Sequence, residues 1–131
     1  MPINIDSALG PLPQALRLRA QRTEILASNL ANADTPNYKA RDFDFRAAMR
    51  QAQGEGVTLR ATRPGHIRQA GGDIGNVPLQ YRVPAQPSLD GNTVDSQAEQ
   101  ASFAENAIRY QATLSFLSSR IRGLKSAIKG E

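Results

Sequence analysis

The feature that most limits the possible folds is the C-terminal stretch Val94–Lys129, which is predicted to form one long helix. It contains no proline, and its single glycine is Gly123. Thr93 or Asp95 can cap its start. Acidic residues gather early and basic residues late, which is the order that the helix dipole favours. About 34 residues at 1.5 Å each extend about 50 Å, so a chain of 131 residues is expected to form a rod rather than a compact domain.

A second helix is predicted from about Pro13 to Asp34. Pro11 and Pro13 suit its first turn, where a helix needs no N–H donor. Proline disfavours the α conformation in the residue before it, so Pro36 requires the helix to end at or before Thr35.

The segment between the helices, residues 54–93, has a different composition. Its seven glycines and four prolines leave little room for long regular elements. Val57–Thr62 and Val77–Val83 are predicted as short strands, paired around the turn Gly71–Asn76. An irregular segment is an equally compatible interpretation. The chain therefore divides into an N-terminal part (1–53), a loop-rich middle (54–93) and a C-terminal helix (94–131).

Both helices carry apolar residues at heptad-like spacing. Two helices alone enclose almost no interior, so we expect a mainly α protein whose helices pair in a coiled-coil-like bundle completed by neighbouring subunits. A Gly/Pro-rich loop or small β module separates them. The residues expected to pack helices in that assembly are Leu16, Thr23, Leu26, Leu30, Ile108, Leu114, Leu117, Ile121, Leu124 and Ile128.

The sequence offers no convincing candidate for a catalytic site. The absence of cysteine excludes disulfides and thiol chemistry, and the single histidine, His66, has no acidic neighbour in sequence. Asp42 and Asp44 are spaced like paired carboxylates, but they alternate with Phe43 and Phe45. That alternation predicts an extended segment with the rings packed inward and the carboxylates in water. We expect no enzyme activity, no cofactor and no metal site.

Charge and hydropathy also restrict the partners. The net charge is +4 and the pI near 10.0, yet no block of five basic residues occurs. Arg17, Arg19 and Arg22 read as a solvated helix face, so no nucleic-acid partner is expected. No apolar run approaches the roughly 20 residues that span a bilayer, and no cleaved secretory signal is expected at the N-terminus.

The N-terminal helix ends in an unusual way, because Asn29 and Asn32 lie one turn apart just before the breaker. Asparagine is a poor residue for helix interiors, since its amide competes for backbone hydrogen bonds. We hypothesise that the two amides cap or clamp the turn Asp34–Tyr38. The alternative is a plain helix stop that needs only Pro36.

The stretch "LASNLANADTPNYKARDFDF" resembles the signature of flagellar axial proteins, a helix ending in A-N-x-x-T-P-G-Y. With "ATRPGHI", "DGNTVD" and "AENAIRYQATLSFLSSRIRGLKSAIKG", the resemblance covers essentially the whole chain. It points to the flagellar basal-body rod family, and within it to the proximal-rod subunits. Asn37 stands where the motif has glycine, and asparagine tolerates the left-handed conformation. The motif residues are Asn29, Asn32, Asp34, Thr35, Pro36, Asn37 and Tyr38.

The resemblance implies a non-enzymatic structural subunit, many copies of which stack helically into a hollow drive shaft. It implies a place in the basal body, in the periplasmic space. It also implies export through the flagellar type III pathway without a cleaved signal peptide. The implied partners are copies of the chain, other rod subunits, the rod-junction protein, the membrane (MS) ring and the export gate. Nucleic acid binding and direct membrane insertion are not implied.

Three alternatives remain open at this point. The nearest is another rod subunit of the same family. The second is a basic helical nucleic-acid-binding protein, which would show strongly salt-dependent binding. The third is an enzyme or ligand-binding domain, for which the sequence offers no convergent polar residues.

Overall fold

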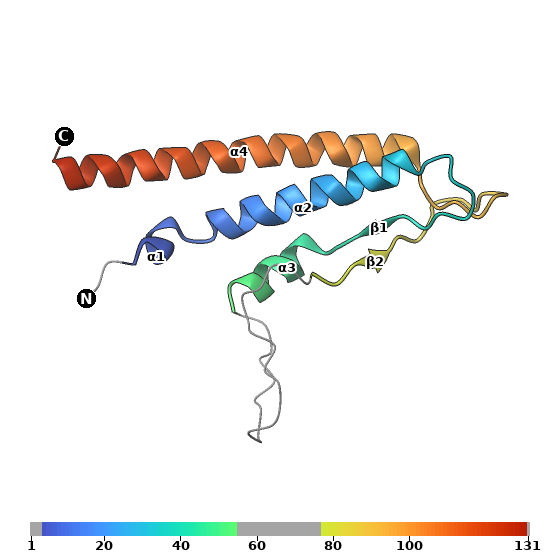
Figure 1. Ribbon diagram of the computed structural model, residues 1–131, viewed down its shortest axis with the longest axis horizontal. Coiled ribbons are helices and arrows are strands. Elements are labelled where there is room, and N and C mark those ends of the chain that lie inside the picture. Colours follow the sequence, from blue (N-terminus) through green and yellow to red (C-terminus); the bar gives the residue numbers. More distant parts are fainter. Residues whose placement is uncertain (1–3, 55–76, 131) are drawn as a thin grey trace, which may run out of the picture.

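The computed structural model describes residues 4–54 and 77–130, in which two long helices pair and a two-stranded sheet lies beside them. The expected mainly α architecture is confirmed (Figure 1). The strand predicted at Val57–Thr62, the turn Gly71–Asn76 and His66 lie outside the described residues. The elements are α1 (Ile5–Leu9), α2 (Leu12–Ala31), β1 (Arg41–Asp42), α3 (Phe45–Ala52), β2 (Gln80–Tyr81) and α4 (Ser96–Lys129).

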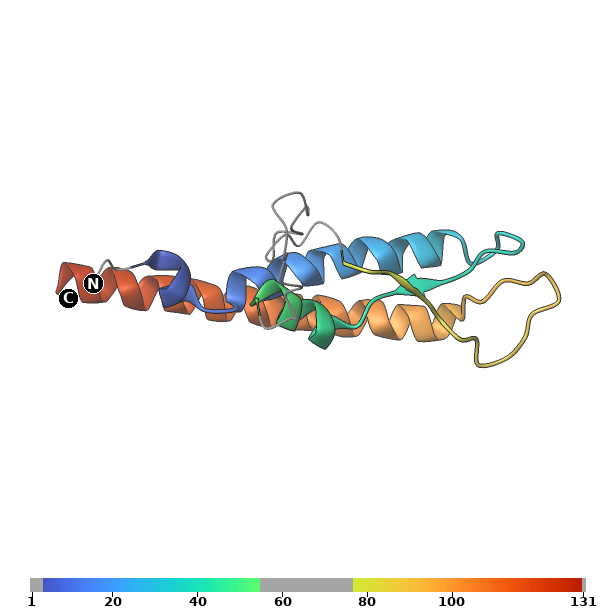
Figure 2. The same ribbon diagram turned by 90° about the horizontal axis from the view of Figure 1, so that it is seen from below.

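The long helix α4 forms as predicted, with 34 residues. The Asp95 side chain caps its start by accepting hydrogen bonds from the backbone N–H groups of Gln97 and Ala98. Gly130 closes its end in the left-handed conformation, with φ of 75°. Helix α2 lies antiparallel beside α4, and both views show α4 continuing well beyond the start of α2 (Figures 1 and 2).

A short helix that was not predicted, α1, precedes the predicted N-terminal helix. Gly10, with φ of 63°, separates it from α2. Helix α2 begins at Leu12 with proline in its first turn and ends at Ala31, with Asn32 as its C-cap. The helix therefore ends before Thr35, as the following proline requires.

The strand β2 falls within the predicted Val77–Val83, and it pairs antiparallel with β1. Arg41 lies opposite Tyr81, and the Arg82 N–H donates to the carbonyl of Ala40 at 2.9 Å, which extends the ladder by one bond. The sheet thus joins the segment after α2 to the segment before α4.

The prediction of an extended segment through Phe45 is wrong, because α3 begins there. The Asp44 carboxylate accepts hydrogen bonds from the N–H groups of Arg46 and Ala47, so it caps a helix instead of lying free in an extended chain. The strand in this stretch, β1, is two residues long, and Asp44 is extended as the cap of α3.

The hydrophobic core lies between α2, α3 and the segment around the strands, on a side of α2 that α4 does not cover. Leu18, Phe43 and Ala48 are buried at its centre. Partly buried side chains surround them: Ile25, Phe45, Met49 and Val77.

This core yields a first prediction. Leu18 is fully buried, so Leu18→Ala should lower the free energy of unfolding by about 2–5 kcal/mol through lost burial and a residual cavity. The measurement is urea denaturation of the isolated chain, followed by circular dichroism. Ile5→Ala is the control, because Ile5 is exposed and should change little. An unaltered midpoint for Leu18→Ala would contradict the assigned core.

Candidate functional site

The end of α2 is built around Asn29, which is fully buried. Its amide pairs with the backbone of Arg41 in both directions: Nδ2 donates to the Arg41 carbonyl at 2.7 Å, and Oδ1 accepts from the Arg41 N–H at 3.1 Å. The backbone of a neighbouring β-strand would form the same two hydrogen bonds with Arg41. The Asn29 side chain of α2 therefore takes the place of a strand on one edge of β1. Asn29 Nδ2 also lies 3.3 Å from Glu99 Oε2.

Asn32 closes the helix. Its Nδ2 donates to the carbonyl of Ser28 at 2.8 Å, and its Oδ1 accepts from the Thr35 hydroxyl at 3.1 Å. The two asparagines therefore have different positions relative to the turn. Asn32 bonds into the turn, as hypothesised, whereas the main partner of Asn29 is Arg41, beyond the turn; the Tyr38 hydroxyl is 3.4 Å from Asn29 Oδ1.

Asn92 clamps the end of α2 more extensively than either of them, and the sequence reasoning missed it. Its Nδ2 lies 3.0, 2.8 and 2.9 Å from the carbonyl oxygens of Asn32, Ala33 and Thr35. Its Oδ1 accepts from the Val94 N–H at 2.7 Å. Two of these carbonyls also accept from backbone N–H groups in the turn, that of Asn32 from Thr35 and that of Thr35 from Tyr38, and Asn92 adds a partner from 57 to 60 residues away in sequence.

The family turn itself interlocks with the loop before α4. Asn37 adopts φ of 60°, the left-handed conformation expected for the residue that replaces glycine. Its N–H donates to the carbonyl of Asp90 at 2.8 Å. Gly91 has φ of 77°, which favours glycine, and a Cβ there would lie 2.9 Å from Asn37 Oδ1, so a larger residue would be strained and would displace the Asn37 side chain. Of the remaining motif residues, Asp34, Thr35 and Pro36 are exposed and Tyr38 is half-buried.

Four charged side chains join α2, both strands and α4. The guanidinium of Arg22 binds Asp42 through two bonds, at 3.1 and 2.9 Å. Arg82 binds the same carboxylate at 2.6 Å and also pairs with Glu99, which is buried. The prediction that the Asp42 carboxylate lies in water is therefore wrong: its side chain is only 15% exposed, because the sheet brings Arg82 over it.

Asp42 is held in its charged form. Burial alone would raise its pKa, but hydrogen bonds from Arg22, Arg82 and the Phe43 N–H outweigh burial and hold the pKa below its ordinary value. The arrangement joins segments of the chain and leaves no free acid for catalysis.

The basic face of α2, which was expected to lie in water, also largely contacts other parts of the chain. Arg22 pairs with Asp42, and Arg19 donates to Thr113 at 3.2 Å while its guanidinium lies 4.4 Å from the centre of the Phe45 ring. Arg17 alone of the three is fully exposed. Among the described residues, no group of three His, Cys, Asp or Glu side chains could hold a metal ion. In the same ranges, no helix combines the length and hydropathy needed to cross a membrane.

A family model described as "Flagella basal body rod protein" matches residues 14–39, which comprise most of α2 and the turn that follows it. The chain is 54% identical over 123 residues to the flagellar basal body rod protein FlgB of Cereibacter sphaeroides, with 94% of each chain covered. The chain belongs to the FlgB family of flagellar basal body rod proteins. FlgB of Escherichia coli strain K12 is 45% identical, and FlgB of Salmonella typhimurium 46%, with 95% and 96% of each chain covered.

In this FlgB-family chain, the residues predicted to pack helices occupy two environments. Those on α2 lie inward: Leu26 is fully buried, and Leu16, Thr23 and Leu30 are half-buried. Leu117 and Leu124 on α4 are half-buried as well. The other predicted residues of α4 are exposed to 71%, 38%, 48% and 86%; these are Ile108, Leu114, Ile121 and Ile128.

The clamp at the end of α2 gives the second prediction. Asn92→Ala removes a buried side chain that donates to three carbonyls and accepts from the Val94 N–H, so it should lower the free energy of unfolding by about 1–3 kcal/mol. Asn92→Asp, which keeps the shape but sets a carboxylate against those carbonyls, should lower it further. Urea denaturation measures both, with the exposed Gln97→Ala as control. Equal stability of Asn92→Asp and the parent chain would refute the clamp.

The third prediction concerns pH. Because the pKa of Asp42 is lowered on folding, its contribution to stability is present at neutral pH and is lost as the pH falls below about 4. Asp42→Asn should be less stable than the parent chain at pH 7, and the difference should shrink toward pH 3. Urea denaturation across this range, with the exposed Asp34→Asn as control, measures the change. A constant difference at every pH would show that the charge of Asp42 does not matter.

Proposed function

We propose that this chain is a subunit of the proximal part of the flagellar rod and that neighbouring subunits pack against the exposed apolar residues of α4. Its family makes the chain a structural subunit of the basal body rod. The finer proposal concerns where the neighbours bind. The observation that carries it is the exposure of large hydrophobic residues along a single helix.

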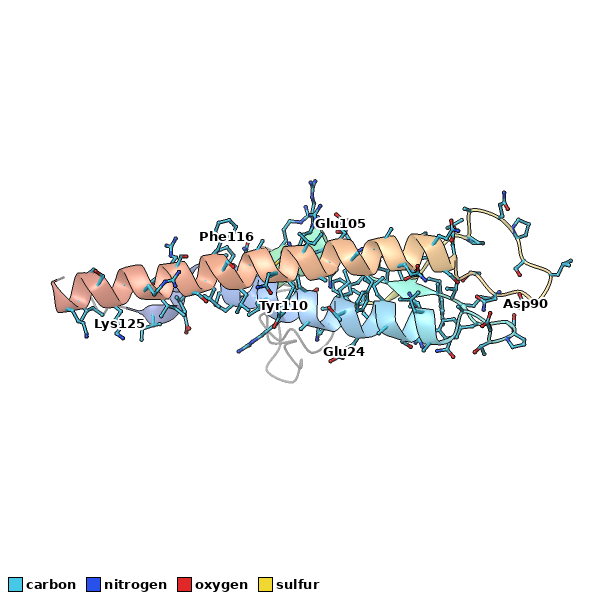
Figure 3. The ribbon with its side chains drawn as sticks, turned by 90° about the horizontal axis from the view of Figure 1, so that it is seen from above. Glu24, Asp90, Glu105, Tyr110, Phe116 and Lys125 are labelled. Carbon is cyan, nitrogen blue, oxygen red and sulfur yellow. The ribbon has the colours of Figure 1, made fainter. Side chains whose placement is uncertain are left out.

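Large apolar side chains of helix α4 are exposed between Ile108 and Ile128. Five of them are exposed, and Figure 3 shows one, Phe116, standing off the ribbon. At about 100° per residue, Leu114, Ile121 and Ile128 lie within about 40° of one another and form a stripe, which marks an interaction surface, whereas Ile108 and Phe116 lie on other sides of the helix. The exposed set is Ile108, Leu114, Phe116, Ile121 and Ile128.

The length of α4 supports the same proposal. Helix α4 has 34 residues and α2 has 20, so α2 cannot cover α4 along its whole length. Among the described residues, the short α1 alone accompanies α4 towards its C-terminus (Figure 1). Helices from other subunits would bury this part of α4 and complete the bundle.

We further propose the finer arrangement that the family resemblance implies. Copies of the chain and other rod subunits would stack helically around a hollow channel, near the membrane ring, the export gate and the rod-junction protein. The chain would reach the periplasmic side by type III export. Its role would be mechanical, with no catalytic step and no cofactor.

The fourth prediction tests the α4 surface. Ile108→Asp or Ile121→Asp should abolish swimming and rod assembly, because each places a charge in a subunit contact, while the isolated chain unfolds at nearly the parent urea concentration. The variants are expressed in cells that lack the native gene. Swimming is scored in soft agar, and basal bodies are isolated to detect rods.

The control is Val83→Asp, the same kind of change at a residue that is 92% exposed and lies outside the helices. It should leave swimming intact. Normal swimming with both α4 variants, or equal loss with Val83→Asp, would exclude α4 as the specific contact surface.

A further inference from the structure

The face of α4 that meets the N-terminal segment carries polar residues that recur at an interval of seven. Glu99, Asn106, Thr113 and Arg120 are spaced 7, 7 and 7 residues apart. Glu99, Asn106 and Thr113 are the buried residues of α4. We call these four residues the polar ladder.

Each member of the ladder binds a different point on the N-terminal segment. Glu99 Oε2 lies 3.3 Å from Asn29 Nδ2. Asn106 Nδ2 donates to the Arg19 carbonyl and to the Thr23 hydroxyl, both at 2.9 Å.

The last two members continue the series toward the N-terminus. Thr113 Oγ1 accepts from Arg19 Nε at 3.2 Å, and Arg120 Nε donates to the carbonyl of Ala8 at 2.7 Å. The partners thus step backward along the chain as the ladder steps forward, as an antiparallel pair requires. The ladder spans Glu99 to Arg120 of α4, the helix that runs beside α2 and α1 (Figure 1).

The ladder is not the arrangement that would make this pair most stable. Asn106 is 1% exposed, and its Oδ1 has no hydrogen-bond partner among the described residues. A buried, unpaired acceptor is destabilising and calls for an explanation. Meanwhile Ile108, two residues further along the same helix, is 71% exposed. The buried centre of this face is therefore polar although a large apolar side chain of the same helix remains exposed.

We propose that the polar ladder fixes the rotation and the register of α4 on α2, so that the exposed apolar residues of α4 face outward to a second copy of this chain. The statement that a second copy contacts these residues rests on the proposed function. The ladder itself acts within one chain, so its members are positioning residues for the assembly surface.

The physical reason is that apolar packing is non-directional whereas hydrogen bonds are directional. Residues two apart on a helix point about 200° apart, so turning Ile108 onto α2 would move Asn106 away from Arg19 and Thr23. Sliding α4 by seven residues would displace it by about 10 Å. The apolar residues beside the ladder would accept that slip, because they share its interval: Phe103, Tyr110, Leu117 and Leu124. A single buried asparagine can fix register in this way in coiled coils.

The test replaces ladder members with apolar residues of similar shape, Asn106→Leu with Thr113→Val. No backbone group is orphaned, because the Arg19 carbonyl still accepts from the Thr23 hydroxyl at 3.0 Å. The chain has no cysteine, so spin labels on Ala27→Cys and Ala112→Cys, both at exposed positions, report the distance between α2 and α4 without background. Pulsed electron spin resonance on the full chain then measures the distribution of that distance.

The parent chain should give one narrow distance, and the double variant a broad or two-peaked distribution, with the helical circular dichroism signal kept and swimming lost. One unchanged narrow distance in the double variant would overturn the proposal. A broadened distance with full swimming would overturn the link to assembly. Gln100→Leu, which adds leucine at an exposed position of α4, is the control and should leave the distance unchanged.

If the double variant does not fold, Thr113→Val alone decides. It removes one contact between the helices, with Arg19, and one bond within α4, to the Arg109 carbonyl. A broadened distance supports the ladder, and an unchanged one with normal swimming refutes it. The distance is measured on the isolated chain, so it does not depend on the proposed contact between copies. Normal swimming of Ile108→Asp would exclude that contact and leave the distance result standing.

Discussion

The pairing of the Asn29 amide with the backbone of Arg41 is the contact on which the other tertiary contacts depend. It fixes β1 against α2, which places Asp42 beside Arg22. Once β1 is in place, β2 can pair with it and carry Arg82 over Asp42 and toward Glu99. One buried side chain on α2 therefore brings together both strands and α4. A buried charged group such as Glu99 is tolerable only where such partners are already positioned.

The long elements could be predicted from the sequence because their signals are local. Pro36 ends α2 before Thr35, and Asp95 caps α4, whatever the rest of the chain does. Family resemblance and the left-handed Asn37 could also be predicted from short motifs. The pairing of the two helices followed from their apolar spacing, although that spacing did not show which face of α4 would meet α2.

What could not be predicted depends on contacts between distant residues. β1 is two residues long and has no detectable periodicity, so its pairing with β2 could not be predicted from the sequence. Helix α3 was not predicted, because the alternation of Phe43 and Phe45 with aspartates was interpreted as an extended segment. Asp44, which precedes apolar residues at helical spacing, is a helix-cap signal that indicates the start of α3. The role of Asn92 depends on a chain that folds back over about 60 residues. The polar ladder was overlooked because only apolar residues were followed along α4.

The position of the hydrophobic core has a consequence for the order of folding. Of the described residues that pack in the core, all but one lie between positions 18 and 49, and Val77 alone comes from later in the chain. Short sequence separations close quickly, because small loops cost little entropy. The bonds from α4 to α2, by contrast, join residues 70 to 94 positions apart. The N-terminal unit of α2, β1 and α3 is therefore expected to collapse first, and α4 to join it last, as a late addition to a surface that already exists.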